Sequence, residues 1–308
     1  MRVVLYWAEG RAQPWIDGLR ARLPQAEVVL WDGEGVCPPG DYGVVWAPPQ
    51  AFFDAQPGLK AVFNLGAGVD ALLRVRVPQQ TAVVRLEDAG MSVQMAEYVC
   101  HAVVRHFREL DAYQTEQEAG RWSFRKPRLR SEFPVGVLGL GVLGSRVAAT
   151  VRQFDFPVNG WSRTPHPIEG VTGFTGWDQL PDFLAASRVL VCLLPLTAET
   201  ENILNRDNLQ RLQPGGYVIN VERGRHLVDE DLLALLDSGH LAGATLDVFR
   251  QEPLPPGHPF WAHPRISVTP HTSARTLRDE TLSQIAGKIL RLERGEPITG
   301  VVDRDRGY

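Results

Sequence analysis

The stretch VGVLGLGVLGSRVAATVRQFDFPVNGWSRTP, residues 135–165, decides the fold. Three glycines in the spacing GxGxxG follow the apolar run VGVL and precede a run that contains neither Gly nor Pro. In a strand–turn–helix unit such glycines allow a tight turn and a close approach to a pyrophosphate, and the helix N-terminus offers N–H donors to it. The residues that we expect to bind a dinucleotide here are Gly139, Gly141, Val142, Leu143 and Gly144.

The residue that usually selects NAD is replaced in this stretch. An Asp or Glu about 20 residues after the glycines binds the ribose 2′-hydroxyl of NAD, but Arg163 stands there, between Ser162 and Thr164. A cation and two hydroxyls can bind a 2′-phosphate, which a carboxylate would repel. We therefore predict that Ser162, Arg163 and Thr164 bind this phosphate and that NADPH is preferred over NADH. The alternative is an exposed arginine that binds no ligand.

The composition is that of an ordinary globular protein. The 308 residues are 44% hydrophobic and 22% charged, with a net charge of −4, so two domains of usual size fit the length. There is no basic block typical of nucleic-acid binding and no apolar run near the roughly 18 residues that cross a bilayer. We also expect no signal peptide, because the first apolar run is short and soon meets Glu9. Three distant cysteines and scattered histidines form no metal-ligand spacing. We expect a cytoplasmic protein without metal, nucleic-acid or membrane partners.

Short apolar runs alternate with helix-like stretches along the chain, which predicts an α/β fold with parallel sheets. The strands expected before the glycines are Val3–Tyr6, Val28–Leu30, Tyr42–Trp46, Leu59–Asn64 and Ala82–Arg85. Those expected from the glycines onward are Val135–Leu138, Val158–Ser162, Arg188–Leu194, Tyr217–Val221, Ala244–Phe249 and Ile266–Thr269. Two Rossmann-like or flavodoxin-like lobes are therefore expected.

Two helices bear on the domain organisation. Residues 91–110 have apolar spacing without Gly or Pro, which predicts one long helix. Residues 273–294 carry an apolar stripe and end at Gly295, and no further strand is expected after them. We infer that this last helix returns to the first lobe. The expected domains are 1–98 with 275–308 for the substrate, and 99–274 for the dinucleotide, with a cleft between them.

Three ionisable residues follow three predicted strands. Arg223 follows the strand at 217–221, Glu252 the strand at 244–249 and His271 the strand at 266–269. Ligands of open parallel sheets bind beyond the carboxyl ends of the strands, where the glycines also lie. Each residue alone would more often be a surface or capping group. The three together, in this order, indicate a catalytic site.

The order of these motifs resembles the D-2-hydroxyacid dehydrogenase family. GLGVLG is followed by VERGR, DVFRQEPLP and TPH, and the segments NLGAGVD and LLPLTAET also match, so the likeness covers nearly the whole chain. It is strongest to the bacterial glyoxylate/hydroxypyruvate reductase A branch, through DAGMSVQMAEY, GWSRT and the tail GEPITGVVDRDRGY. One departure is Glu222, which stands where relatives often have a small residue beside the arginine.

The resemblance implies a role for each of the three residues. Arg223 would bind the carboxylate and carbonyl oxygen of a 2-oxoacid. His271 would be the general acid that protonates the carbonyl oxygen as hydride reaches the carbon, and Glu252 would orient the imidazole and keep it protonated.

The resemblance also implies further binding residues. Backbone N–H groups around Ala67, Gly68 and Val69 would receive the substrate carboxylate, and Trp46 would narrow the pocket unless it is only a half-buried core residue. Asp247 would accept a hydrogen bond from the nicotinamide carboxamide. The other residues expected at the coenzyme are Leu194, Pro195 and Val221.

The implied activity is NADPH-dependent reduction of glyoxylate to glycolate and of hydroxypyruvate to D-glycerate, by a homodimer. Two alternatives stay open. One is another dehydrogenase of the family, such as a D-lactate-like 2-oxoacid reductase. The other is a non-catalytic nicotinamide-sensing scaffold on the same fold. A formate dehydrogenase is disfavoured, since Gln would suit that chemistry better than Glu252.

Overall fold

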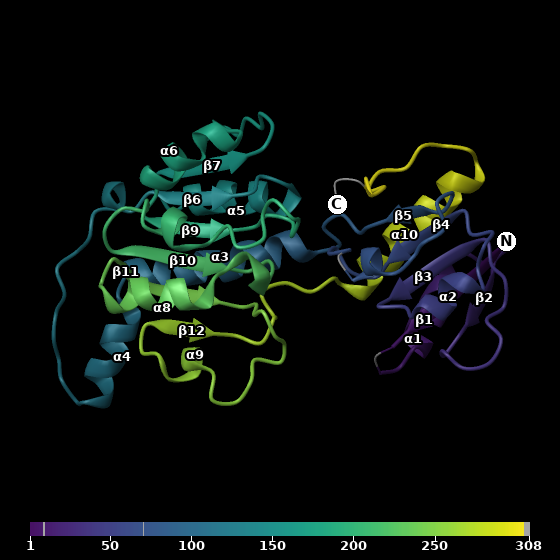
Figure 1. Cartoon of the computed structure of the whole chain (residues 1–308), viewed down its shortest axis with the longest axis horizontal. Helices are drawn as coiled ribbons and strands as arrows, with labels where there is room; N and C mark the ends of the chain where they lie inside the picture. The colour runs from purple at the N-terminus through teal and green to yellow at the C-terminus, as the bar shows by residue number, and fades with distance from the viewer. Residues whose placement is uncertain (9, 70, 305–308) are drawn as a thin grey trace. The chain divides into compact units, whose positions relative to one another are not determined.

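A computed structural model describes residues 1–8, 10–69 and 71–304, and it places the glycine-rich stretch directly after a buried strand, β6 (Val135–Leu138). β6 lies between β7 (Val158–Ser162) and β9 (Val189–Cys192) in a seven-stranded parallel sheet of order β12-β11-β10-β9-β6-β7-β8 (Figure 1). The chain adds strands on one side of β6 and then on the other. The strand order therefore reverses between β6 and β9, which is where open α/β sheets bind ligands.

Helices cover both faces of this sheet. Val189 and Val191 of β9 share a buried cluster with α3 (Met91–Phe107) and α5 (Val142–Arg152). The alternate residues, Leu190 and Cys192, share another cluster with helices on the opposite face. Burial on both faces explains why these strands are continuous apolar runs. The other elements are β10 (Gly216–Asn220), β11 (Leu241–Leu246), β12 (Ile266–Val268), α6 (Leu180–Ala185), α7 (Arg206–Leu209), α8 (Asp229–Asp237) and α9 (Pro259–Ala262).

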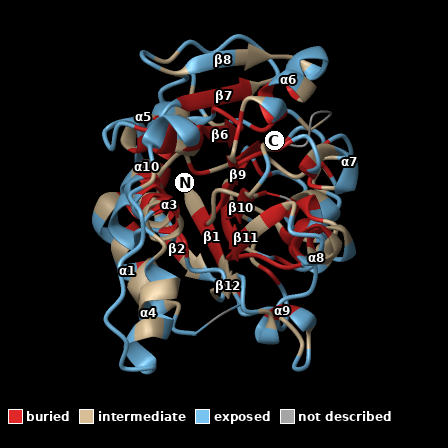
Figure 2. Ribbon diagram, turned by 90° about the vertical axis from the view of Figure 1, so that its left-hand side faces the viewer, coloured by how far each residue is buried: buried red, intermediate tan, exposed pale blue. Residues whose placement is uncertain are grey.

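The edge strand β8 (Thr172–Thr175) is missing from the predicted strands. Its sequence, TGFT, has no apolar run, and its residues are exposed or half-buried, in contrast to the buried β7 (Figure 2). Backbone pairing with β7, from Asn159 and Thr172 to Ser162 and Thr175, holds it in the sheet. The strand therefore depends on a neighbour and not on its own side chains.

The chain divides into two units, Met1–Met91 with Arg275–Tyr308 and Ser92–Ala274. The division falls earlier than the boundary expected at 98, because most of α3 belongs to the second unit. Its buried residues Met95, Val99 and Val103 pack with the strands of the seven-stranded sheet.

The smaller unit has its own parallel sheet. Its described residues form strands in the order β2-β1-β3-β4-β5, a doubly wound arrangement. The last helix, α10 (Arg278–Glu293), packs on this sheet through Leu282, Ile285 and Ile289. The other elements are β1 (Arg2–Trp7), β2 (Glu27–Leu30), β3 (Tyr42–Trp46), β4 (Ala61–Asn64), β5 (Ala82–Val84), α1 (Gln13–Arg22) and α2 (Gln50–Asp54). After α10, Val301 forms an isolated antiparallel bridge with Val84 of β5, which the sequence did not predict.

Both long helices are shorter than predicted. The helix at 91–110 ends at Phe107, because Glu109 adopts a left-handed backbone (φ 54°) and a separate helix, α4 (Leu110–Glu118), follows. The last helix begins at Arg278 and not at residue 273, because the N–H of Leu277 bonds to the carbonyl of Ala89 outside the helix. No helix within the described residues is long and apolar enough to span a bilayer.

One predicted strand is displaced along the chain. The range 244–249 was expected, but β11 ends at Leu246. Residues after it leave the sheet because the N–H of Phe249 bonds to the carboxylate of Glu252, at 2.9 Å. The apolar residues Val248 and Phe249 are buried there without being strand residues.

Candidate active site

The turn between β6 and α5 requires glycine at two positions, Gly139 and Gly144. Gly139 has φ 105°, and a Cβ on it would lie 2.7 Å from the carbonyl oxygen of Leu193. A Cβ on Gly144 would lie 1.8 Å from the carbonyl oxygen of Gly139, whereas one on Gly141 would meet no described atom within 4 Å. The chain is thus tightly packed on one side of the turn and open at Gly141.

The first turn of α5 is suited to an anion. Gly141 is its N-cap, and no described side chain caps the helix there. The N–H groups of the first turn have no partner within a helix and carry partial positive charge. Together with the open space at Gly141, this geometry fits the pyrophosphate of a dinucleotide.

Arg163 lies at the end of the neighbouring strand. The N–H of Gly139 bonds to the carbonyl of Trp161 at 2.9 Å, so the end of β7 is held beside the glycine turn. The hydroxyl of Ser162 donates to the carbonyl of Thr164 at 2.7 Å. Ser162 therefore shapes the turn, while Arg163 and Thr164 have exposed side chains after it.

Two further loops follow strands near the reversal of strand order. Leu194 is buried after β9, and the carbonyl of Pro195 accepts a hydrogen bond from the hydroxyl of Thr200 at 2.6 Å. Val221 is buried after β10. The coenzyme residues expected in these loops thus follow β9 and β10 at their carboxyl ends.

His271 and Glu252 form a close pair. Nδ1 of His271 lies 2.7 Å from Oε2 of Glu252, and Oε1 of Glu252 accepts the N–H of Phe249. Both carboxylate oxygens are thereby fixed. Nε2 of His271 makes no hydrogen bond within the described residues, so it is the nitrogen that can meet a substrate.

The pair favours a protonated imidazole. The hydrogen bond and charge of Glu252 raise the pKa of His271 above 6.5, against the lowering by burial and by the charge of Arg223. Burial raises the pKa of Glu252, but the hydrogen bonds from His271 and Phe249 outweigh it and leave that pKa below 4.5. An ionised Glu252 beside a histidinium is a suitable arrangement for a general acid.

Asp247 is fully buried and holds the loop that carries His271. Its Oδ1 accepts from the hydroxyl of Thr269 and from the N–H of Thr272, and its Oδ2 accepts from the N–H of Ser273 at 2.8 Å. Both carboxylate oxygens thus have donors within the protein, and Oδ2, which receives one of them, can still accept the hydrogen bond expected from a nicotinamide carboxamide.

Arg223 lies in the loop after β10, next to an acidic residue. Its Nη1 donates to the backbone carbonyl of Glu222 at 2.6 Å and lies 3.0 Å from a carboxylate oxygen of the same residue. About a quarter of each side chain is exposed, so solvent screens this pair only in part. Glu222 is thus an internal counter-ion for the expected substrate arginine.

His226 connects two loops of the site, a role that sequence reasoning missed. The fully buried imidazole has Nδ1 3.1 Å from the carbonyl of Arg223 and Nε2 3.4 Å from the carbonyl of Pro195. Burial alone would lower its pKa, but Cys192, Glu222 and the Pro195 carbonyl raise it to about 9. The only sequence signal is that His226 follows Arg223 by one short turn.

The smaller unit carries a separate cluster after β3 and β4. The side-chain amide of buried Asn64 donates to the carbonyls of Gly66 and Gly68, at 3.0 and 2.7 Å. In a trans peptide the N–H of the next residue points opposite to the carbonyl. The N–H groups of Ala67 and Val69 therefore point away from Asn64, as an anion cradle requires. Asn64 was not singled out from the sequence, and Asp70 lies outside the described residues.

Trp46 lies against this loop. A Cβ on Gly66 would be 2.4 Å from Cζ3 of the Trp46 indole, so the ring packs directly on the glycine. The indole is half-buried against the core of the smaller unit.

The arrangement defines the class of protein. Arg223, Glu252 and His271 follow the neighbouring strands β10, β11 and β12 of a dinucleotide-binding sheet. A family model described as "D-isomer specific 2-hydroxyacid dehydrogenase, NAD binding domain" matches residues 100–273. The chain belongs to this dehydrogenase family.

Its similarity to named relatives extends over the full length. It is 44% identical over 314 residues to the glyoxylate/hydroxypyruvate reductase A of Yersinia enterocolitica, and 46% identical over 314 residues to that of Photorhabdus laumondii, with 100% of both chains covered in each case.

Two solved structures are also similar. One is a D-isomer specific 2-hydroxyacid dehydrogenase from Xanthobacter autotrophicus in complex with NADPH and MES, with a TM-score of 0.93, 42% identity and coverage of 100% of this chain and 99% of that one. The other is an NADPH-dependent glyoxylate/hydroxypyruvate reductase from Sinorhizobium meliloti in complex with NADP and sulfate, with a TM-score of 0.93, 34% identity and coverage of 100% of both chains.

Proposed function

We propose that this dehydrogenase reduces glyoxylate to glycolate and hydroxypyruvate to D-glycerate with NADPH. The observation that carries the proposal is the His271–Glu252 pair, with its 2.7 Å contact, at the carboxyl edge of a dinucleotide-binding sheet. The names of the full-length relatives and the NADPH and NADP complexes of similar structures support it.

Substrate binding would use a side chain and a backbone cradle. The guanidinium of Arg223 would bind the carboxylate and the carbonyl oxygen of the 2-oxoacid, because its planar fork of donors suits paired oxygens. The N–H groups of Ala67 and Val69, directed by Asn64, would bind a carboxylate oxygen, with Gly68 allowing close approach. Trp46 would limit the size of the substrate.

His271 would supply the proton. Its Nε2 would donate to the carbonyl oxygen and leave the imidazole neutral, while Glu252 holds Nδ1 and favours the charged form before the reaction. When bound, a reduced nicotinamide supplies the hydride to the carbonyl carbon. Asp247 would fix the loop that bears His271.

The coenzyme would be held by the residues that the sequence predicts to bind it. Gly139, Gly141, Val142, Leu143 and Gly144 would hold the pyrophosphate, with the N–H donors of α5. Arg163 and Thr164, at the turn that Ser162 shapes, would bind the 2′-phosphate. Apolar residues of the next loops would contact the rest of the coenzyme; these are Leu194, Pro195 and Val221.

We also propose a homodimer in the cytoplasm. The segment between α4 and β6 exposes Trp122 by 92%, Phe124 by 87% and Leu129 by 61%, an apolar surface that a second copy would cover. Buried cysteines without a disulfide suit a reducing compartment. Light scattering at several concentrations tests the dimer; a monomer at micromolar concentration would contradict it.

A substrate and coenzyme panel tests the activity. Glyoxylate, hydroxypyruvate and pyruvate are each assayed with NADPH and with NADH. We expect the first two to be reduced most efficiently, and NADPH to give the higher kcat/KM. Best turnover with pyruvate would favour a D-lactate-like reductase. Tight NADPH binding without turnover of any 2-oxoacid would favour a sensing scaffold.

A further inference from the structure

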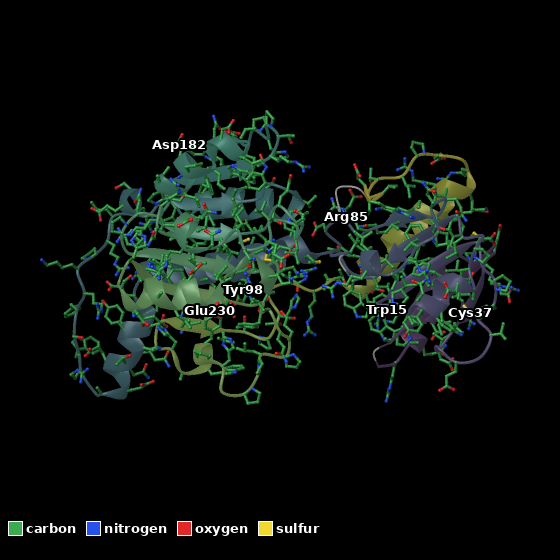
Figure 3. The ribbon with its side chains drawn as sticks, viewed as in Figure 1. Trp15, Cys37, Arg85, Tyr98, Asp182 and Glu230 are labelled. Atoms are coloured by element: carbon green, nitrogen blue, oxygen red, sulfur yellow. The ribbon has the colours of Figure 1, made fainter. Side chains whose placement is uncertain are left out.

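A chain of hydrogen bonds runs from α3 to the loop of His271. The hydroxyl of Tyr98, labelled in Figure 3, lies 2.5 Å from Oγ1 of Thr269, and this oxygen lies 2.5 Å from Oδ1 of Asp247. All three residues belong to the larger unit, although Tyr98 and Thr269 are 171 residues apart in sequence.

The chemistry of the three groups sets the direction of the chain. The carboxylate of Asp247 accepts, and it already receives the N–H groups of Thr272 and Ser273. The single hydroxyl proton of Thr269 is therefore directed at Asp247, so the Tyr98 hydroxyl must donate to Thr269. Burial, together with the charge of Asp247, raises the pKa of Tyr98 to about 12, so this hydroxyl keeps its proton near neutral pH.

The Asp247 end of this hydrogen-bond path holds an unusual backbone conformation at His271. His271 has φ 50°, a left-handed conformation that a non-glycine residue keeps only where its surroundings impose it. Its N–H bonds to the carbonyl of Asp247 at 2.8 Å, and the next two N–H groups bond to the Asp247 carboxylate. Whatever orients Asp247 thus orients His271.

We infer that Tyr98 is a positioning residue for His271, which it holds through Thr269 and Asp247. The inference rests on the proposed function only in taking His271 as the proton donor. The ring of Tyr98 packs against the apolar core of the larger unit, and its hydroxyl anchors the catalytic loop. The two roles are separable, because phenylalanine keeps the ring and removes the hydroxyl.

Tyr98→Phe is the test, and Tyr217→Phe is its matched control. Tyr217 makes the same kind of buried contact, 2.8 Å from the hydroxyl of Thr245 in β11, and it lies outside the path from Tyr98 through Thr269 to Asp247. Loss of one neutral hydrogen bond should lower kcat for glyoxylate about fivefold in Tyr98→Phe. The Kd for NADPH and the Tm should match those of Tyr217→Phe, whose kcat should stay near that of the wild type.

Titration of His271 by NMR gives a readout that does not depend on turnover. A loop held less firmly loosens the Glu252 contact that raises the pKa of His271. We expect a lower midpoint in Tyr98→Phe than in the wild type and in Tyr217→Phe. An unchanged midpoint would overturn the inference, as would equal losses of kcat in the two variants. If the wild type fails to reduce either 2-oxoacid, the proposed function fails, and the NMR midpoint still decides whether Tyr98 positions His271.

Thr269→Val gives a second check within the same chain. It removes the middle of the hydrogen-bond path and keeps the shape of the side chain. If the path is continuous, Tyr98→Phe should lower kcat much less in the Thr269→Val background than in the wild type. Additive losses would mean that the two hydroxyls act independently, and would overturn the inference.

Discussion

The two sheets share an architecture and differ in the groups that follow their strands. The named strands pair in parallel in both sheets, and the strand order reverses in each. The larger sheet presents ionisable side chains after its strands, held by other side chains, as in the His271–Glu252 pair. The smaller sheet presents a half-buried indole and a loop whose carbonyls are turned inward by Asn64. The fold provides each sheet with an edge at the carboxyl ends of its strands, and the residues after each strand determine what that edge can bind or catalyse.

This difference predicts two kinds of mutational effect. Proton transfer depends on the charge and orientation of one group, so changes on the larger sheet should lower kcat. An anion cradle of backbone N–H groups binds substrate similarly in the ground and transition states, so changes on the smaller sheet should raise KM.

The largest effect is expected for His271→Ala. The proton donor is lost, so kcat for glyoxylate should fall by roughly 10²–10⁴-fold, the usual range for a positioned acid. NADPH affinity, measured by fluorescence, should change little. His263→Ala is the control, since His263 also lies near a carboxylate, 4.0 Å from Asp237. Comparable activity in the two variants would remove His271 from the reaction.

Arg163→Asp should change the coenzyme preference. A cation is replaced by a carboxylate that repels the 2′-phosphate, and charged hydrogen bonds of this kind contribute about 1.5–3 kcal/mol. The kcat/KM for NADPH should fall at least about tenfold, mainly through KM, while that for NADH changes little. Arg211→Asp controls for the change in net charge at another exposed arginine. Equal losses with both coenzymes would show that Arg163 does not bind the phosphate.

Asn64→Ala tests the smaller sheet. It frees the carbonyls of Gly66 and Gly68, so the N–H groups of the loop lose their fixed direction. KM for glyoxylate should rise about fivefold, the equivalent of roughly one hydrogen bond, with a smaller change in kcat. Asn159→Ala removes a similar buried amide, which donates to the carbonyl of Ala186 in the larger unit, and should leave KM unchanged. A loss confined to kcat would contradict the proposal that the smaller sheet acts mainly on KM and the larger sheet on kcat.

Glu222→Gln should have the smallest effect, and in the favourable direction. It removes a charge that competes with the substrate carboxylate for Arg223. Because the pair is partly exposed, a contribution of about 0.2–1 kcal/mol is expected, and KM for glyoxylate should fall up to about fivefold. Glu201→Gln, which breaks the nearby ion pair with Arg225, is the control. A higher KM in Glu222→Gln would mean that Glu222 orients Arg223 for the substrate.

The sequence was sufficient to predict those strands that are defined by their own residues. The strands at 42–46, 135–138 and 158–162 agree residue for residue, because each is a buried run that ends at a turn. The edge strand β8 and the break at Glu109 were missed, since one depends on pairing with β7 and the other on a left-handed residue that is not glycine.

Prediction of the site was limited in the same way, because residues with a local sequence signal were found and residues with distant contacts were not. Arg223, Glu252 and His271 could be chosen because each follows an apolar run and fits a family motif. The groups that hold them could not be chosen, because their contacts are distant in sequence. Tyr98 contacts Thr269, which is 171 residues away in sequence, and His226 contacts Pro195, which is 31 residues away. Neither Tyr98 nor His226 has a sequence motif of its own. Asn64 acts locally, but through backbone carbonyls that leave no pattern of side chains.

The pH dependence of kcat tests the central claim most directly, with the wild type compared with Glu252→Gln. The pKa of His271 is raised above 6.5 chiefly by Glu252, so the protonated acid persists below that raised pKa and is lost as pH rises through it. Glyoxylate reduction by the wild type should therefore be constant at low pH and fall at a midpoint above 6.5. In Glu252→Gln the fall should come at lower pH, because the neutral amide no longer favours the imidazolium. The same midpoint in both proteins, or a rate that rises with pH, would contradict the assignment of His271 as the acid held protonated by Glu252.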